Sequence, residues 1–105
     1  MRAVHWAPYF LALLAEAYAQ EGQVEVGLAT LAEALAAAQA TGERWAEAEL
    51  YRLRGVLLLR QRGTQQEEAE TWLQRALDVA RRQEARSLEL RAAMSLSRLW
   101  HQQGK

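Results

Sequence analysis

The chain has 105 residues, of which 50% are hydrophobic and 25% are charged, and its 13 basic and 13 acidic residues leave a net charge of zero. This length suits one domain with a core held by packing alone, and the absence of cysteine excludes a disulfide framework and a cysteine zinc site. The zero net charge argues against a dedicated nucleic-acid binder, and no apolar run approaches the roughly 20 residues of a membrane span.

The composition and periodicity of the chain predict an all-helical fold. Ala, Glu, Lys, Leu and Arg make up 63 of the 105 residues, a composition typical of helices and helical repeats. Apolar residues recur at the helical period, as in Leu28, Leu31 and Leu35, and the strict alternation that would indicate a strand is absent. We therefore expect five helices and no strands.

The first three helices are expected at residues 8–21, 24–40 and 44–62. Pro8 suits the first turn of a helix, because the N–H that proline lacks would have no helical partner there. Gly42 follows the second helix, and a glycine at this place favours helix termination in the left-handed conformation.

Two more helices are expected at residues 65–82 and 87–102. Thr64 and Glu67 form a capping-box sequence at the start of the fourth helix. In such a box the threonine side chain accepts a hydrogen bond from the N3 amide, and the glutamate reaches back to the cap.

Regularly spaced residues indicate an internal repeat. Gly22, Gly63 and Gly104 are each 41 residues apart, and the pair Ala34-Leu35 recurs 42 residues later as Ala76-Leu77. Constant spacing of this kind is typical of repeat proteins.

The repeat divides a single domain, residues 1–105, into a first unit at about 8–41, a second at about 44–83 and an incomplete third at about 86–105. The shift of 42 also places Glu84 at the position of Gly42. If that turn needs a positive φ, Glu84 adopts it at a cost of order 1 kcal/mol.

Residues 13–35 resemble a tetratricopeptide repeat. Small residues stand where the two helices of such a repeat touch, and Tyr18 and Gly22 match its aromatic and turn positions. The matching small or characteristic residues are Ala15, Gly27 and Ala34 in the first unit, Gly55, Ala69 and Ala76 in the second, and Ser97, Trp100 and Gly104 in the third. The resemblance implies a right-handed superhelical solenoid of antiparallel helix hairpins, although the repeat proline is absent and the unit exceeds the usual length of about 34 residues.

A narrower resemblance covers residues 27–59 and 69–100. These segments are similar to the C-terminal helical-repeat region of large bacterial signalling proteins, in which a nucleotide-cyclase or DNA-binding domain and an ATPase domain precede the repeats. No G-x-x-x-x-G-K-[ST] loop occurs in this chain. The resemblance therefore implies only a scaffold role here, within a repeat array that is longer in the family.

The titratable residues form no recognisable catalytic or metal-binding pattern. His5 and His101 lie 96 residues apart, without the spacing of a helical zinc motif. Glu67, Glu68 and Glu70 cluster at a predicted helix start, where the helix dipole favours carboxylates. We therefore expect no enzymatic activity, no cofactor and no metal.

Charge is distributed unevenly along the chain, with a net charge of −5 in residues 1–50 and +5 in residues 51–105. The resemblance implies that the first helix of each unit lines a concave surface that binds a partner. The register then predicts eight contact residues, which are Tyr9, Glu16, Gln20, Glu49, Arg52, Arg60, Arg91 and Arg98. Alternatively, the arginines of this set are solvated and paired with nearby glutamates.

The last predicted helix, 87–102, has no second helix of its own unit to cover it. Leu96, Leu99 and Trp100 occur on it at packing spacing, and large exposed apolar patches usually mark an interface. We expect these residues to be exposed and to mediate self-association as a homodimer or docking onto a further repeat, and the opposite charges of the two halves also permit a head-to-tail contact.

Taken together, the residues and the resemblance predict a non-catalytic scaffold or regulatory segment of a bacterial signalling protein, located in the cytoplasm, that binds a protein or peptide and no membrane. Two alternatives remain open. The arginine-rich C-terminal half could bind nucleic acid, with tryptophans stacking on bases, although Trp45 and Trp100 fall at core positions. Small-molecule sensing between the repeats is the other alternative.

Overall fold

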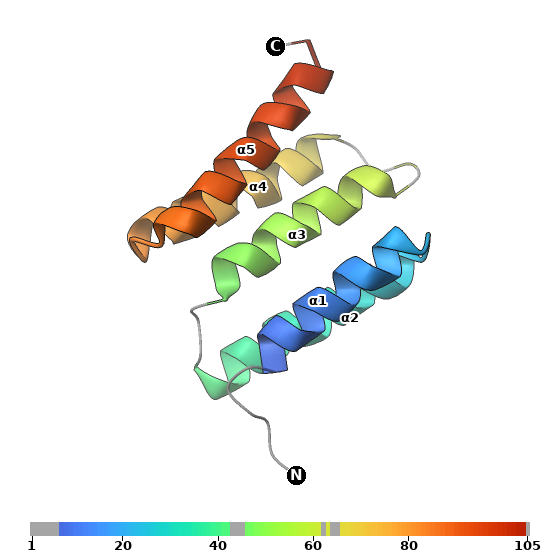
Figure 1. The fold of residues 1–105 in the computed structure, drawn as a ribbon, viewed down its shortest axis with the longest axis vertical. Coiled ribbons are helices and arrows are strands. Elements are labelled where there is room, and N and C mark those ends of the chain that lie inside the picture. The colour runs from blue at the N-terminus through green and yellow to red at the C-terminus, as the bar shows by residue number, and fades with distance from the viewer. Residues whose placement is uncertain (1–6, 43–45, 62, 64–65, 105) are drawn as a thin grey trace.

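The computed structural model describes residues 7–42, 46–61, 63 and 66–104, which form five α-helices (Figure 1). The helices are α1 (Ala7–Gln20), α2 (Val24–Thr41), α3 (Glu47–Arg60), α4 (Gln66–Arg82) and α5 (Arg86–Gln102). The expected all-helical class is confirmed, and no strand occurs within these described ranges. Every helix begins and ends within 3 residues of its predicted bounds. The capping-box sequence at Thr64 lies outside the described residues.

The helices are arranged in two layers (Figure 1). α1, α3 and α5 lie side by side in one layer, and α2 and α4 lie behind them. α1 packs against α2 and α3 packs against α4, each as an antiparallel pair, while α5 packs on α4 and α3. The shortest extent of the molecule is 17 Å, which fits two layers of helices with axes about 8–10 Å apart.

Each antiparallel pair contains one close approach at a glycine. A Cβ atom on Gly27 of α2 would lie 2.8 Å from the backbone oxygen of Ala15 in α1. A Cβ atom on Gly55 of α3 would lie 3.0 Å from the backbone oxygen of Ala69 in α4. The glycine is therefore in the second helix of one pair and in the first helix of the other, and in both cases it lets two backbones approach.

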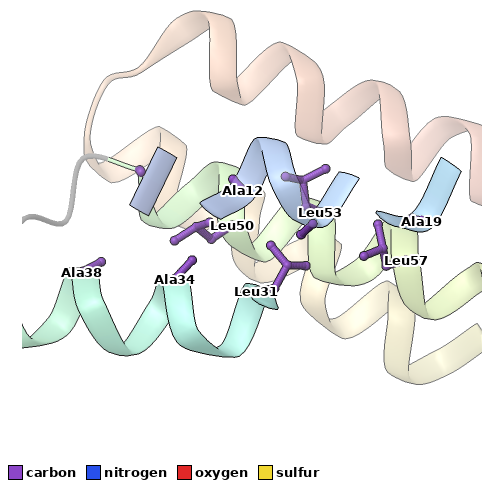
Figure 2. Close-up of a cluster of buried hydrophobic side chains, with 10 residues drawn as sticks. Ala12, Ala19, Leu31, Ala34, Ala38, Leu50, Leu53 and Leu57 are labelled. Carbon is purple, nitrogen blue, oxygen red and sulfur yellow. The ribbon is translucent and has the colours of Figure 1, made fainter. Parts of the chain in front are cut away.

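The first core cluster joins α1, α2 and α3 (Figure 2). Small residues of α1 and α2 meet Leu31 of α2 and three leucines of α3, which are Leu50, Leu53 and Leu57. These leucines are at most 3% exposed. Because α3 inserts them against the first pair, the core continues from one pair of helices to the next.

The second core cluster joins α4 and α5 and includes partly buried side chains of α3. Leu73 and Ala76 are both fully buried in it, as is Ala34 in the first cluster. Leu96 and Leu99 of α5 belong to the same cluster and are each 1% exposed.

The burial of Leu96 and Leu99 corrects one sequence-based expectation. These two side chains were expected on an exposed face, but that expectation is wrong because they point toward α3 and α4 and fill the chain's own core. Trp100 is half-buried against the same cluster, and its Nε1 donates a hydrogen bond to Oε2 of Glu70 at 3.1 Å. The exposed apolar residues of α5 are instead Leu90 and Met94.

The expected positive φ of Glu84 is confirmed, with a value of 56°. The backbone N–H of Ala85 donates a hydrogen bond to the carbonyl oxygen of Ala80 at 2.9 Å, and the backbone N–H of Glu84 donates one to the carbonyl oxygen of Arg81 at 3.1 Å. The same pair of bonds closes α1 around Gly22, whose φ is 85°. Both turns have the bonds of a Schellman motif, which favours glycine.

We predict that Glu84→Gly raises the free energy of unfolding by about 0.5 to 1 kcal/mol, because glycine adopts positive φ without the steric cost that glutamate carries. The reciprocal change, Gly22→Glu, should lower it by a similar amount. Chemical denaturation measures both. A decrease in stability for Glu84→Gly would contradict the strain assigned to this turn.

Candidate functional site

One face of the layer formed by α1, α3 and α5 brings together five of the eight predicted contact residues. Tyr9 and Glu16 of α1, Glu49 and Arg52 of α3 and Arg91 of α5 line a depression of about 200 Å³. Apolar atoms from the same helices complete its walls, contributed by Ala12, Leu13 and Leu53. We call this depression the acidic site, because two glutamates of adjacent helices lie in it.

Glu49 accepts hydrogen bonds from both arginines of the acidic site. Oε2 of Glu49 accepts hydrogen bonds from Nη2 of Arg52 at 2.7 Å and from Nη1 of Arg91 at 2.9 Å, and Oε1 accepts one from Nε of Arg52 at 3.0 Å. Nη1 of Arg52 also donates to Oγ of Ser95 at 3.4 Å. The side chains of Glu49 and Arg52 are only 10% and 14% exposed. The alternative interpretation of pairing with nearby glutamates therefore applies to Arg52 and Arg91.

A second depression of about 320 Å³ lies further along the same face, between the C-terminal halves of α3 and α5. Its charged lining residues are Arg60 and Arg98, and its apolar lining comes from Val56, Leu59 and Leu99. Within the described part of the chain neither arginine forms an ion pair. We call this depression the basic site. Gln20, the remaining predicted contact residue, is exposed at the end of α1 and lines neither depression.

A stack of arginine and aromatic side chains between α3 and α4 was not predicted from the sequence. The ring centroids of Tyr51 and Trp72 are 5.4 Å apart, and the guanidinium carbons of Arg54 and Arg75 lie 4.7 and 5.1 Å from the Trp72 centroid. Cation–π attraction accounts for these distances. The available signal was an aromatic residue followed three places later by arginine in each helix, as in Tyr51-Arg54 and Trp72-Arg75.

Arg54 of α3 lies over the ring face of Trp72. Trp72 is half-buried between these partners. Arg54 and Trp72 therefore contact each other, whereas Arg75 of the same stack is exposed and lines a further depression with Tyr51.

The candidate residues for other chemistries are dispersed. In the ranges that the structure covers, no three His, Asp or Glu side chains are grouped as metal ligands would be. His101 and Glu67 are exposed, and His5 lies outside the described residues. None of the helices described here has the length and apolar character needed to cross a membrane.

Comparisons of the chain with protein-family models, with curated proteins and with solved structures give no match. The assignment of a role to the two depressions therefore rests on their own geometry and charge.

Proposed function

We propose that the chain is a non-catalytic, tetratricopeptide-like protein-interaction module of a cytoplasmic bacterial signalling protein, and that its basic site binds an acidic peptide segment. The observation that carries the proposal is the pair of arginines at the basic site, Arg60 and Arg98, which lack ion-pair partners within the described residues and line one depression with apolar side chains. A superhelical arrangement of the helix pairs is part of this proposal.

The chemistry of guanidinium groups favours carboxylates as the ligand of the basic site. Guanidinium presents parallel N–H donors that match a carboxylate in a bidentate geometry. Val56, Leu59 and Leu99 line the same depression as the two arginines, so an apolar side chain next to an acidic one in the partner would be buried. Leu-Glu or Glu-Leu sequences combine these two features.

The acidic site is suited to a different part of the partner. Arg52 and Arg91 are already bound to Glu49, so they offer less charge to an incoming carboxylate than Arg60 and Arg98 do. Tyr9 and Glu16 leave this end of the face aromatic and acidic. The face as a whole therefore favours a peptide whose acidic residues lie at the basic site and whose other end is not acidic.

This arrangement supports a peptide over a nucleic acid. A nucleic-acid site tracks several successive phosphates with several cations. Here two uncompensated arginines line the basic site, and Glu16 and Glu49 lie on the same face. A continuous phosphate backbone along this face would therefore meet Glu16 at the acidic site, where Arg52 and Arg91 are already bound to Glu49.

We predict that Arg98→Glu weakens the binding of a fluorescein-labelled peptide of sequence Glu-Leu-Glu-Glu-Leu-Glu by at least about tenfold, which corresponds to about 1.4 kcal/mol. Fluorescence anisotropy measures the affinity. The matched control is Arg86→Glu, which makes the same charge change on α5 at a residue that lines neither depression. The melting temperature of both variants should stay close to the parent value, because both residues are exposed.

Two results would contradict the proposal. Equal weakening by Arg98→Glu and Arg86→Glu would show that only the overall charge matters. Binding of single-stranded DNA more tightly than the peptide, with a steep loss of affinity as salt rises, would favour the nucleic-acid alternative.

A further inference from the structure

α1 has an exposed apolar face, whereas the equivalent face of α3 is buried. Phe10 and Leu13 are 51% and 49% exposed, and Ala17 on the same side is also exposed. A shift of 40 residues along the sequence takes these positions to Leu50, Leu53 and Leu57 of α3, which are 0%, 3% and 1% exposed.

The same face is buried in α5 as well. A further shift of 42 residues leads to Ala92, Ser95 and Leu99, which are 1%, 5% and 1% exposed. In α3 this face packs on α1 and α2, and in α5 it packs on α3 and α4. The exposed face of α1 therefore corresponds to the face that α3 and α5 each use to pack on the preceding pair of helices. We call it the leading face.

α5 carries the complementary exposed strip on its other side. Leu90 and Met94 are 62% and 47% exposed, and Ser97 and His101 continue the strip at helical spacing. In α3 the residues 42 positions earlier are covered partly by α4, which contacts Ala48 and Gly55, and partly by α5, whose Ser95 accepts a hydrogen bond from Arg52, the counterpart of Met94. We call this strip the trailing face.

The charges of the two ends favour contact between unlike faces. Residues 7–42, which form α1 and α2, contain four glutamates and no lysine or arginine. α5 contains three arginines, Arg86, Arg91 and Arg98, against one glutamate. Two leading faces brought together would place acidic helices side by side, whereas a leading face on a trailing face pairs opposite charges.

We propose that the chain associates with a second copy of itself head to tail, with the leading face of one copy on the trailing face of the next. The contact continues the layer of α1, α3 and α5, so α1 of one copy lies beyond α5 of another. It buries Phe10, Leu13 and Ala17 as the chain already buries their counterparts in α3. A heterologous contact of this kind leaves one face free at each end, so assemblies grow with concentration unless they close into a ring.

The test uses two single variants of the full chain, Ala17→Glu on the leading face and Leu90→Glu on the trailing face. Both replaced residues are exposed in the helices, so the variants should fold, and circular dichroism with a melting curve checks this. Light scattering coupled to size exclusion gives the mass. We expect the parent mass to rise with protein concentration and to fall as salt is added, and we expect each variant alone to be monomeric.

Mixing the two variants separates a head-to-tail contact from a two-fold contact. Each variant keeps one intact face, so an equimolar mixture should form a heterodimer of one copy of each and grow no further. If Leu90→Glu alone still dimerises, the contact joins two leading faces, and if Ala17→Glu alone still dimerises, it joins two trailing faces. Either result, or a parent chain that stays monomeric at high micromolar concentration, overturns the proposal.

Discussion

Replacing Leu73 with alanine is expected to lower the free energy of unfolding by about 2 to 5 kcal/mol, the usual range for a buried leucine. Leu73 is 0% exposed and lies in the second core cluster, between α3, α4 and α5. The lost side chain leaves a cavity that the surrounding helices fill only partly. For a domain of this length each kcal/mol corresponds to about 4 to 8 °C in melting temperature.

The control for this substitution is Leu90→Ala, which removes the same atoms from a side chain that is 62% exposed. It should change the stability by no more than about 0.5 kcal/mol. Thermal and urea denaturation at low protein concentration compare the two. Equal effects of Leu73→Ala and Leu90→Ala would show that Leu73 does not anchor the core.

Leu73 also explains why residue 55 is glycine. A Cβ atom at Gly55 would lie 2.8 Å from Cγ and 2.9 Å from Cδ2 of Leu73, so Gly55→Ala forces that side chain to move. In the Leu73→Ala background those two contacts are gone and the contact with the backbone oxygen of Ala69 remains, so Gly55→Ala should cost less there than in the parent chain. A double-mutant cycle should therefore give a coupling energy of about 0.5 kcal/mol or more.

The C-terminal ends of four helices were predictable because a turn residue with positive φ follows each of them. Glycines with positive φ follow α1, α2 and α5, and Glu84 takes that conformation after α4 at the position that the 42-residue shift assigns to it. Helix bounds depend on such local backbone preferences. A regular spacing of turn residues therefore carries most of the information about element order.

The face that each helix buries was only partly predictable. Leu96 and Leu99 were expected to be exposed because the third unit was expected to lack a second helix. Leu99 instead has the register of Leu57, on the side by which α3 packs on the preceding pair, and Leu96 lies in one core cluster with Leu73 and Ala76 of α4. Periodicity identifies an apolar stripe without indicating which neighbour covers it. The exposed strip of α5 instead contains Leu90 and Met94, and the leading face of α1 contains the larger residue Phe10.

The candidate site was also only partly predictable from the sequence. The repeat register assigned Tyr9, Glu16, Glu49, Arg52 and Arg91 to one surface, and the structure places these five residues around one depression. It did not show that one carboxylate binds two of the arginines, because ion pairing depends on side-chain rotamers and on distances between helices rather than on spacing along one helix. Arg60 and Arg98, which keep their charge available, are distinguished only by the structure.

Glu49→Ala is expected to lower the free energy of unfolding by about 2 to 3 kcal/mol, since it leaves the half-buried Arg52 without its carboxylate. Removal of one partner from a fully buried pair costs about 3 to 5 kcal/mol. The cost should be lower here, because Arg52 keeps its bond to Ser95 and Arg91, which is 58% exposed, can turn to solvent. The matched control is Glu89→Ala, which breaks the exposed pair with Arg81.

The pair of Glu89 with Arg81 has side-chain exposures of 37% and 59%, against 10% and 14% for Glu49 with Arg52. Pairs at the surface contribute about 0 to 1 kcal/mol, so Glu89→Ala should cost less than half as much as Glu49→Ala. A second comparison isolates the pairing itself: Arg52→Ala combined with Glu49→Ala should be more stable than Glu49→Ala alone, since no uncompensated cation is left between α3 and α5. If the double variant is the less stable of the two, Arg52 contributes to stability by packing and not by its ion pair with Glu49.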